Sequence, residues 1–354
     1  MNLSATLERL CSLSTEAAEV VPATLYRKHP GLREAIGPRG VAACRTDIGY
    51  HIEYLCAALL AGHSTPFVEY ANWLSLVLRS RQIRDDVLGE SFSLLADFLA
   101  VNLQTDEAEA VAKIMADGRA SLGSHPALPG ISRLMPETLS SDAKSYLDSL
   151  LADDRKTAAS SIIERQREGS SLVTLETRVI QPAMYEVGNL WQKNLISVAQ
   201  EHLATAISQA VMAEAFSQAE FAEPNGRRAL FANIEANHHA LGLRMVADAF
   251  ETSGWETRCL GTNVPSATII SQIDAMKPDL IGISASLPSQ FVALSKLIEM
   301  VTAEFGQQRP FIMLGGLAIN SMPGIAEHLR ADISAADAEA ACRIAAEFRP
   351  SKND

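Results

Sequence analysis

The sequence predicts a protein that combines an all-α part with an α/β part: helical segments come first, and a parallel β-sheet flanked by helices follows. Two observations carry this prediction. Up to about residue 222, apolar residues recur at spacings of three and four, which is the period of an amphipathic helix. From residue 225 onward, short apolar runs alternate with helical patterns, the order of elements expected for parallel strands joined by helices.

Breaks in these patterns divide the chain into three segments. Residues 1–122 and 131–222 are each expected to be helical, 226–350 should hold the sheet, and the Pro- and Gly-containing stretch 123–130 reads as a linker. Helices of the first segment are expected at 3–20, 46–60, 66–79, 85–101 and 106–120, with breaks at Pro30–Gly31, Gly37–Pro38, 62–64 and Thr105. Those of the second are expected at 143–152, 156–168, 172–184 and 196–219. The alternating segments of the third are 228–234, 240–253, 256–260, 266–276, 279–284, 289–304, 310–315, 322–328 and 337–347.

Composition indicates a soluble globular protein of the cytoplasm. The apolar fraction is 47%, and no apolar run is long enough to span a bilayer, so no membrane association is expected. The N-terminus lacks the basic start and apolar core of a secretion signal. The five cysteines are scattered without a C-x-x-C pair, which is typical of free thiols in a reducing compartment. A net charge of −12 and the lack of a basic cluster argue against direct nucleic-acid binding.

The most informative stretch is the expected strand-to-helix turn at Asn237–Gly242. In open α/β sheets, ligands bind where the strands end, and this turn follows the expected strand 228–234. His239 can ligate a metal from the loop, Asn237 can orient its imidazole through the other ring nitrogen, and Gly242 lets a flat ligand approach the backbone. We interpret the adjacent His238 as structural.

Two further motifs follow on later strands: Ser284-Ala-Ser286-Leu and Gly315–Gly316. With His239, they resemble the cobalamin-binding fingerprint. The resemblance implies that His239 replaces dimethylbenzimidazole as the lower cobalt ligand, and that the serines and glycines line a slot for the displaced nucleotide tail. Asn237 departs from the usual acidic residue and predicts a less basic imidazole, and Ser286 stands where the shorter motif has Leu.

Trp191, then nine residues, then Glu201–His202 form a second block. It resembles the four-helix cap of cobalamin-dependent photoreceptors of the CarH type, which sits on a Rossmann-like (flavodoxin-like) domain. The resemblance implies that Trp191 shields the 5′-deoxyadenosyl group on cobalt, and that Glu201 and His202 contact this upper ligand. Gln192 departs from a histidine found in photoreceptors, which puts light-driven bis-histidine ligation through this position in doubt.

In the first segment, Tyr50, His51 and Tyr54 precede an aromatic stripe that contains Tyr70 and Trp73. A globin-like helical domain ahead of a capped cobalamin domain resembles the photocobilins. That resemblance implies a second chromophore, biliverdin, held by the aromatics with Arg45 or His51 on its propionates. The alternative is a dimerisation bundle in which these aromatics are simply core.

These observations lead us to expect an adenosylcobalamin-binding light sensor rather than an enzyme. Its output would pass through a homo-oligomer or a regulatory protein partner. Two alternatives stay open. One is a corrinoid methyl carrier for a methyltransferase, and the other is a heme-binding sensor on the same fold, since histidine also ligates iron.

Overall fold

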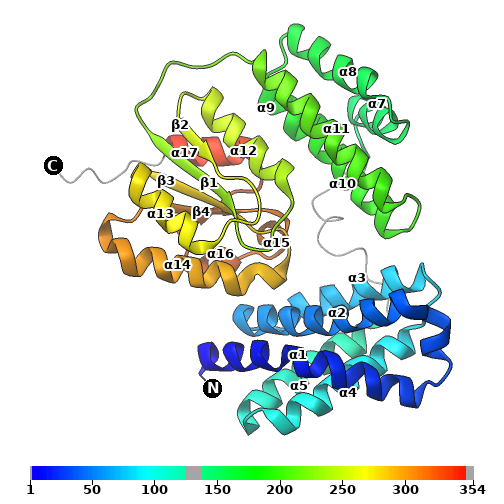
Figure 1. Cartoon of the computed structure of the whole chain (residues 1–354). Helices are drawn as coiled ribbons and strands as arrows, with labels where there is room; N and C mark the ends of the chain where they lie inside the picture. Colours follow the sequence, from blue (N-terminus) through cyan, green and yellow to red (C-terminus); the bar gives the residue numbers. More distant parts are fainter. Residues whose placement is uncertain (1, 124–137, 348–354) are drawn as a thin grey trace. The chain divides into compact units, whose positions relative to one another are not determined.

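The computed structural model describes residues 2–123 and 138–347. The chain divides into two compact units, one with residues 1–129 and 288–292 and the other with residues 130–287 and 293–354 (Figure 1). The second and third segments of the sequence therefore form one unit. The expected linker at 123–130 lies almost entirely outside the described residues.

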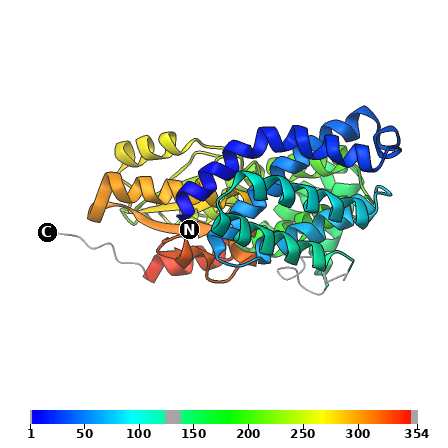
Figure 2. The ribbon, with the colours of Figure 1, turned by 90° about the horizontal axis from the view of Figure 1, so that it is seen from below.

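The N-terminal unit is built from helices that lie alongside one another (Figure 2). They are α1 (Leu3–Lys28), α2 (Leu32–Ala61), α3 (Thr65–Arg79), α4 (Asp85–Asn102) and α5 (Thr105–Ser121). The breaks predicted near Pro30, Gly62 and Thr105 coincide with helix ends. At Gly37, φ is 64° and ψ is −177°, so α2 kinks in front of Pro38, as the Gly-Pro pair predicted. The globin-like arrangement stays a prediction.

The second unit begins with a series of helices: α7 (Ser141–Leu151), α8 (Arg155–Arg167), α9 (Leu172–Leu175), the π-helical turn η1 (Glu176–Ile180), α10 (Gln181–Gln192) and α11 (Val198–Ser217). We call 141–217 the helical segment. Several of its helices start at a capping side chain: the oxygens of Ser140, Asp154, Ser171 and Ser197 each accept a backbone N–H three residues on. The single helix expected over 172–184 is interrupted by η1.

The sheet has five parallel strands in the order β2-β1-β3-β4-β5, and its parallel arrangement confirms the prediction. The strands are β1 (Arg228–Asn233), β2 (Glu256–Cys259), β3 (Leu280–Ser284), β4 (Phe311–Gly315) and β5 (Ile333–Ser334). The helices that follow them are α12 (Ala240–Thr252), α13 (Ser266–Met276), α14 (Phe291–Phe305), α15 (Leu317–Ser321), α16 (Ile325–His328) and α17 (Ala338–Glu347). Helices α12 and α17 cover one face, and α13 and α14 the other (Figures 1 and 2). This is the flavodoxin-like strand order, which places its crevice between β1 and β3.

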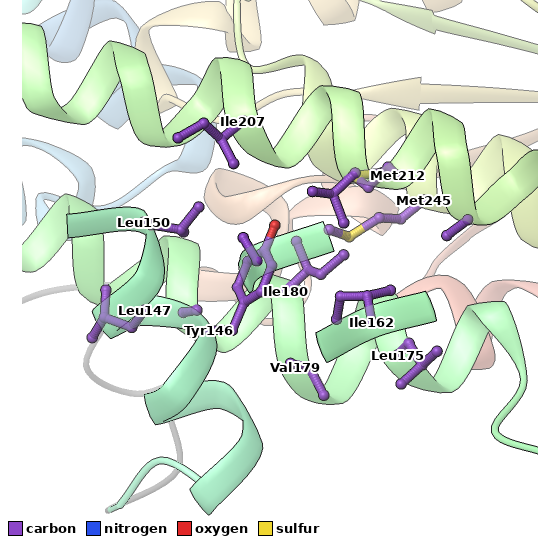
Figure 3. Close-up of a cluster of buried hydrophobic side chains, with 14 of the residues drawn as sticks. Tyr146, Leu147, Leu150, Ile162, Leu175, Val179, Ile180, Ile207, Met212 and Met245 are labelled. Carbon is purple, nitrogen blue, oxygen red and sulfur yellow. The ribbon is translucent and has the colours of Figure 1, made fainter. Parts of the chain in front are cut away.

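The helical segment and the sheet share a core. Met245 and Ala249 of α12 and Ala338 of α17 are buried together with Tyr146, Ile180 and other side chains of the helical segment. Figure 3 shows Met245 beside Met212 at the centre of this cluster. Helix α12 is thus held from both sides, and its first residue follows directly on the candidate ligand His239. None of the helices in the described part of the chain is both long and apolar enough to cross a bilayer.

Candidate functional site

The site forms where β1, β3 and β4 end. The register pairs Asn233 of β1 with Ser284 of β3, and Ser284 with Gly315 of β4, so these three residues stand side by side at the carboxyl edge. After β1 the chain turns, and His239 is the N-cap residue of α12. The sequence motifs on three separate strands therefore converge on one edge of the sheet.

Asn237 fixes the orientation and the tautomer of His239. The Asn237 side chain is fully buried, and its Nδ2 donates to the Ser284 carbonyl at 2.9 Å. Its Oδ1 accepts the His239 backbone N–H at 3.1 Å and lies 3.2 Å from His239 Nδ1. Because Oδ1 can only accept, Nδ1 must carry the proton, which leaves the lone pair on Nε2. This is the arrangement in which an imidazole ligates a metal through Nε2.

The surroundings of His239 favour its neutral form. The surrounding protein lowers the pKa of His239, chiefly by desolvation and also through His238, while Glu201 opposes this effect. A neutral imidazole is the form that binds metals. The influence of Glu201 also places this α11 carboxylate within electrostatic range of the histidine.

Two asparagines that the sequence analysis did not predict hold this loop in place. Asn233 is fully buried, and its Nδ2 donates to the His239 carbonyl at 3.1 Å. Its Oδ1 is buried with no hydrogen-bond partner among the described residues. Asn263, beyond β2, accepts the Ala236 N–H at 2.8 Å and donates its own N–H to the Asn237 carbonyl at 2.9 Å. The sequence did contain a signal for Asn233, because it is a polar residue near the end of the mainly apolar strand expected at 228–234.

The protein's own structure requires glycine at some positions of the motif and not at others. A Cβ built at Gly242 meets no atom within 4 Å, so the protein itself leaves open space there. Gly316 has a φ of 97°, and its Cβ would lie 2.4 Å from the Ala285 carbonyl oxygen, so the close approach of the β3 and β4 ends demands glycine. A Cβ at Gly315 would make an ordinary contact at 3.5 Å with the Ala335 carbonyl. Gly242 is therefore the position whose glycine the protein's own packing does not explain.

Ser284 and Ser286 follow the same edge, Ser284 nearly buried at 8% exposure and Ser286 half-buried. Just beyond the Gly315–Gly316 pair lies a pocket of about 240 Å³. Its lining comes from α15, α16 and the end of β5: Ile319, Asn320, Met322, Pro323, Gly324, Ile325, Ala326, Ser334 and Ala336. The edge thus offers room next to the glycine pair.

The helical segment contributes the second motif. Trp191, near the end of α10, is partly buried against the shared core. In the first turn of α11, Glu201 Oε2 pairs with His202 Nδ1, and Glu201 Oε1 accepts the Thr205 hydroxyl at 3.2 Å. Around this turn, three large apolar side chains are exposed: Leu195, Val198 and Leu203. Apolar surface with one carboxylate–imidazole pair suits a large, mainly apolar ligand.

This site offers too few ligands for a metal ion that arrives without ligands of its own. Among residues 2–123 and 138–347 there is no group of three or more His, Cys, Asp or Glu side chains arranged to hold one. A single histidine with a free Nε2 fits a metal whose other ligands arrive with it, in a flat ring. The open space at Gly242 accommodates such a ring.

The aromatic residues singled out in the first segment separate into two groups. Tyr54 and Tyr70 stack with ring centroids 4.0 Å apart, and the Tyr70 hydroxyl lies 2.7 Å from His51 Nδ1 in the buried core. Burial lowers the pKa of His51 to about 3, so its ring is neutral and offers no cation to a propionate. Tyr50 is exposed, and Arg45 pairs with Glu19 at 2.7 Å. Bilin binding here stays a prediction.

Two family models match this chain, and both are described as a B12 binding domain. One covers residues 227–346, which contain the sheet and its helices, and the other covers residues 143–215, which lie in the helical segment. The chain therefore contains a cobalamin-binding domain, and these matches indicate a cobalamin or corrinoid cofactor.

Relatives fall into two kinds. The HTH-type transcriptional repressors CarA and CarH of Myxococcus xanthus are 29% and 28% identical over 142 and 153 residues, or 39% and 43% of this chain. The chain spans about half the length of these repressors, 45% and 50%. Dimethylamine corrinoid protein 2 of Methanosarcina acetivorans is 22% identical over 46% of this chain and 75% of its own length.

The monomethylamine corrinoid protein of Methanosarcina barkeri has a similar structure, with a TM-score of 0.52 and 18% identity. The match covers 57% of this chain and 95% of that protein. At this identity the likeness shows a shared fold alone.

Proposed function

We propose that this chain binds adenosylcobalamin with His239 as the lower cobalt ligand, and that it acts as a light sensor rather than an enzyme. The observation that carries the proposal is the Asn237–His239 pair, which presents an oriented, neutral imidazole beside the open space at Gly242. The nearly buried Ser284, Gly315 and Gly316 would accept the displaced nucleotide tail, next to the 240 Å³ pocket.

The upper side of the site would be closed by the helical segment. Trp191 would cover the upper ligand, while the Glu201–His202 pair would offer a carboxylate and an imidazole to its polar edge. When bound, adenosylcobalamin supplies a cobalt–carbon bond that light can break. The chain's own part is then to exclude water from the bond in the dark, and to rearrange these three residues once the upper ligand has left.

A second function has its own support. Similarity to dimethylamine corrinoid protein 2 and a fold shared with the monomethylamine corrinoid protein favour a corrinoid carrier that works with a methyltransferase. The two functions make opposite demands on the upper side. A carrier must let a partner's substrate reach cobalt, whereas a sensor gains from the shield that Trp191 would provide.

Illumination separates these functions. Protein loaded with adenosylcobalamin in the dark is exposed to green light, and its absorption spectrum and size are compared with a dark sample. A sensor loses the adenosyl group, changes its spectrum within the exposure, and alters its self-association or its binding to a regulatory protein. An adenosyl form that light leaves unchanged, together with a methyl form that transfers its group in the presence of a corrinoid methyltransferase, would favour the carrier.

A further inference from the structure

Two buried carboxyl groups meet where the helical segment packs on α12. Glu176 opens the π-helical turn η1 and is fully buried, and Asp248 of α12 is 1% exposed. The two side chains lie within hydrogen-bonding reach of each other. The pair therefore joins the helical segment to the helix that begins after His239.

This pair has few donors. Arg244 Nη2 lies 2.6 Å from Asp248 Oδ1, and the guanidinium also stacks over Phe216 of α11 at 4.9 Å. Neither oxygen of Glu176 receives a hydrogen bond from a donor in the described part of the chain. If both carboxyl groups were ionised, the single guanidinium of Arg244 could neutralise only one of them, and the other would be a buried unpaired charge. Proteins avoid this cost when one of the two groups retains its proton.

The surrounding charges point the same way. Burial, followed by the charge of Asp248, raises the pKa of Glu176 to about 9. Burial also raises the pKa of Asp248, while Arg244 opposes that shift. The charged and titratable groups that face the pair are Arg244 and Glu251 of α12 and Cys259 of β2.

The backbone at Glu176 is unusual as well. The Gln181 N–H bonds to the Glu176 carbonyl, a five-residue step that inserts one extra residue into the helix. Such π-turns cost helix stability and occur frequently at functional sites. Here the turn places Glu176 against Asp248 in a core that is made mainly of apolar side chains.

We propose that Glu176 and Asp248 share one proton, carried by Glu176, and that this acid pair clamps the helical segment onto α12 and so sets how firmly the corrinoid site is closed. The clamp regulates the cobalamin site and in that respect rests on the proposed function. In the protonated pair, Glu176 donates to Asp248, and Asp248 stays ionised against Arg244. When the proton leaves, the two carboxylates repel each other and the contact opens.

The proton on Glu176 can be detected directly by infrared difference spectroscopy of the cofactor-free, full-length protein, recorded as a function of pH. We expect the absorption of a protonated carboxyl group at pH 7 that disappears with a midpoint near pH 9. It should be missing in Glu176→Gln, and its midpoint should move to lower pH in Asp248→Asn, where the neighbouring negative charge is gone. The second variant keeps the test decisive if the first does not fold. No such band in the wild type, or a band unaffected by both substitutions, would overturn the proposal.

The clamp is tested by the affinity for adenosylcobalamin, measured in the dark by equilibrium dialysis at pH 7 and pH 10. Only the protonated pair closes the site, so affinity is kept below the Glu176 pKa and falls as pH rises through it. With a pKa of about 9, the affinity of the wild type should fall about tenfold between these pH values. The side-chain amide of Glu176→Gln donates the same hydrogen bond at every pH, and it has no proton to lose in this range. The affinity of this variant for adenosylcobalamin should therefore differ by no more than about twofold between pH 7 and pH 10.

Glu214→Gln makes the same charge change at an exposed site of α11 and should behave like the wild type. Parallel losses in Glu176→Gln and the wild type would contradict the clamp. A failure of the proposed function looks different: His239→Ala would then bind cobalamin normally, whereas the infrared result in cofactor-free protein would be unaffected.

Discussion

Replacing Gly242 should strengthen the free protein and weaken cofactor binding at the same time. Gly242 lies in the first turn of α12, and a Cβ there meets no protein atom within 4 Å. Gly→Ala inside a helix stabilises by up to ~1 kcal/mol, because glycine loses more backbone freedom on folding. For a unit of this size, that gain raises the melting temperature by roughly 2–4 °C. Glycine at position 242 therefore lowers the stability of the cofactor-free protein.

Binding should move the opposite way. A side chain that enters a fully packed contact typically costs ~1–3 kcal/mol, which corresponds to about 5- to 150-fold in affinity. We expect Gly242→Ala to fall in this range for adenosylcobalamin and Gly242→Leu to lie at or beyond its upper end. Melting curves of cofactor-free protein and equilibrium dialysis in the dark measure the two effects.

The matched control is Gly49→Ala in α2, where the added Cβ would lie 3.8 Å from Ser14 Oγ. It should give a similar gain in stability and no change in affinity. If Gly242→Leu bound adenosylcobalamin as tightly as the wild type, no flat ligand would approach this turn, and the reasoning would be refuted.

Three further predictions concern other parts of the chain. Asn237→Ala should weaken cobalamin binding by roughly 10- to 100-fold, because the imidazole loses the group that orients it, and unchanged affinity in a dialysis titration would count against that role. His51 has a folded pKa of about 3, below its unfolded value, so its contribution to stability is complete above the unfolded pKa and is lost as pH falls toward 3. Denaturant titrations between pH 6 and 4 should show that His51→Phe lowers the slope of stability against pH by roughly 1.4 kcal/mol per pH unit relative to the wild type, and equal slopes in the two proteins would show that His51 is not the group responsible. Finally, co-expression with heme oxygenase should yield protein whose red absorbance survives gel filtration, and colourless protein under saturating biliverdin would leave a sensor with cobalamin alone.

Most of the fold could be predicted from periodicity, because long amphipathic helices and buried parallel strands repeat one pattern many times. The exceptions are local. The π-turn at Glu176 adds a single residue to a helix, which hardly alters the spacing of apolar side chains in 172–184. Strand β5 has only two residues, too few for a pattern, and is defined by its ladder to Met313 and Leu314.

The site was partly readable for a similar reason. Asn237, His239 and Ser284 lie close to strand ends, and the parallel register brings those ends together. The contacts of Asn233 and Asn263 depend on how two separate loops meet, which spacing does not encode. The Glu176–Asp248 pair joins helices far apart in the chain, so each carboxylate on its own resembled an ordinary surface residue.

The central claim, that His239 supplies the lower ligand of cobalt, is tested most directly by electron paramagnetic resonance of bound cob(II)alamin. Protein is prepared with histidine labelled by the heavy nitrogen isotope. The nucleus of this isotope has two spin states, whereas that of the common isotope has three. A labelled nitrogen bound to cobalt therefore splits each line into two, and an unlabelled one splits it into three. We predict two-line splitting in the wild type and in the His238→Ala control, and loss of binding or of the splitting in His239→Ala. Three-line splitting in the labelled wild type would mean that the nucleotide base still holds cobalt, and would contradict the account.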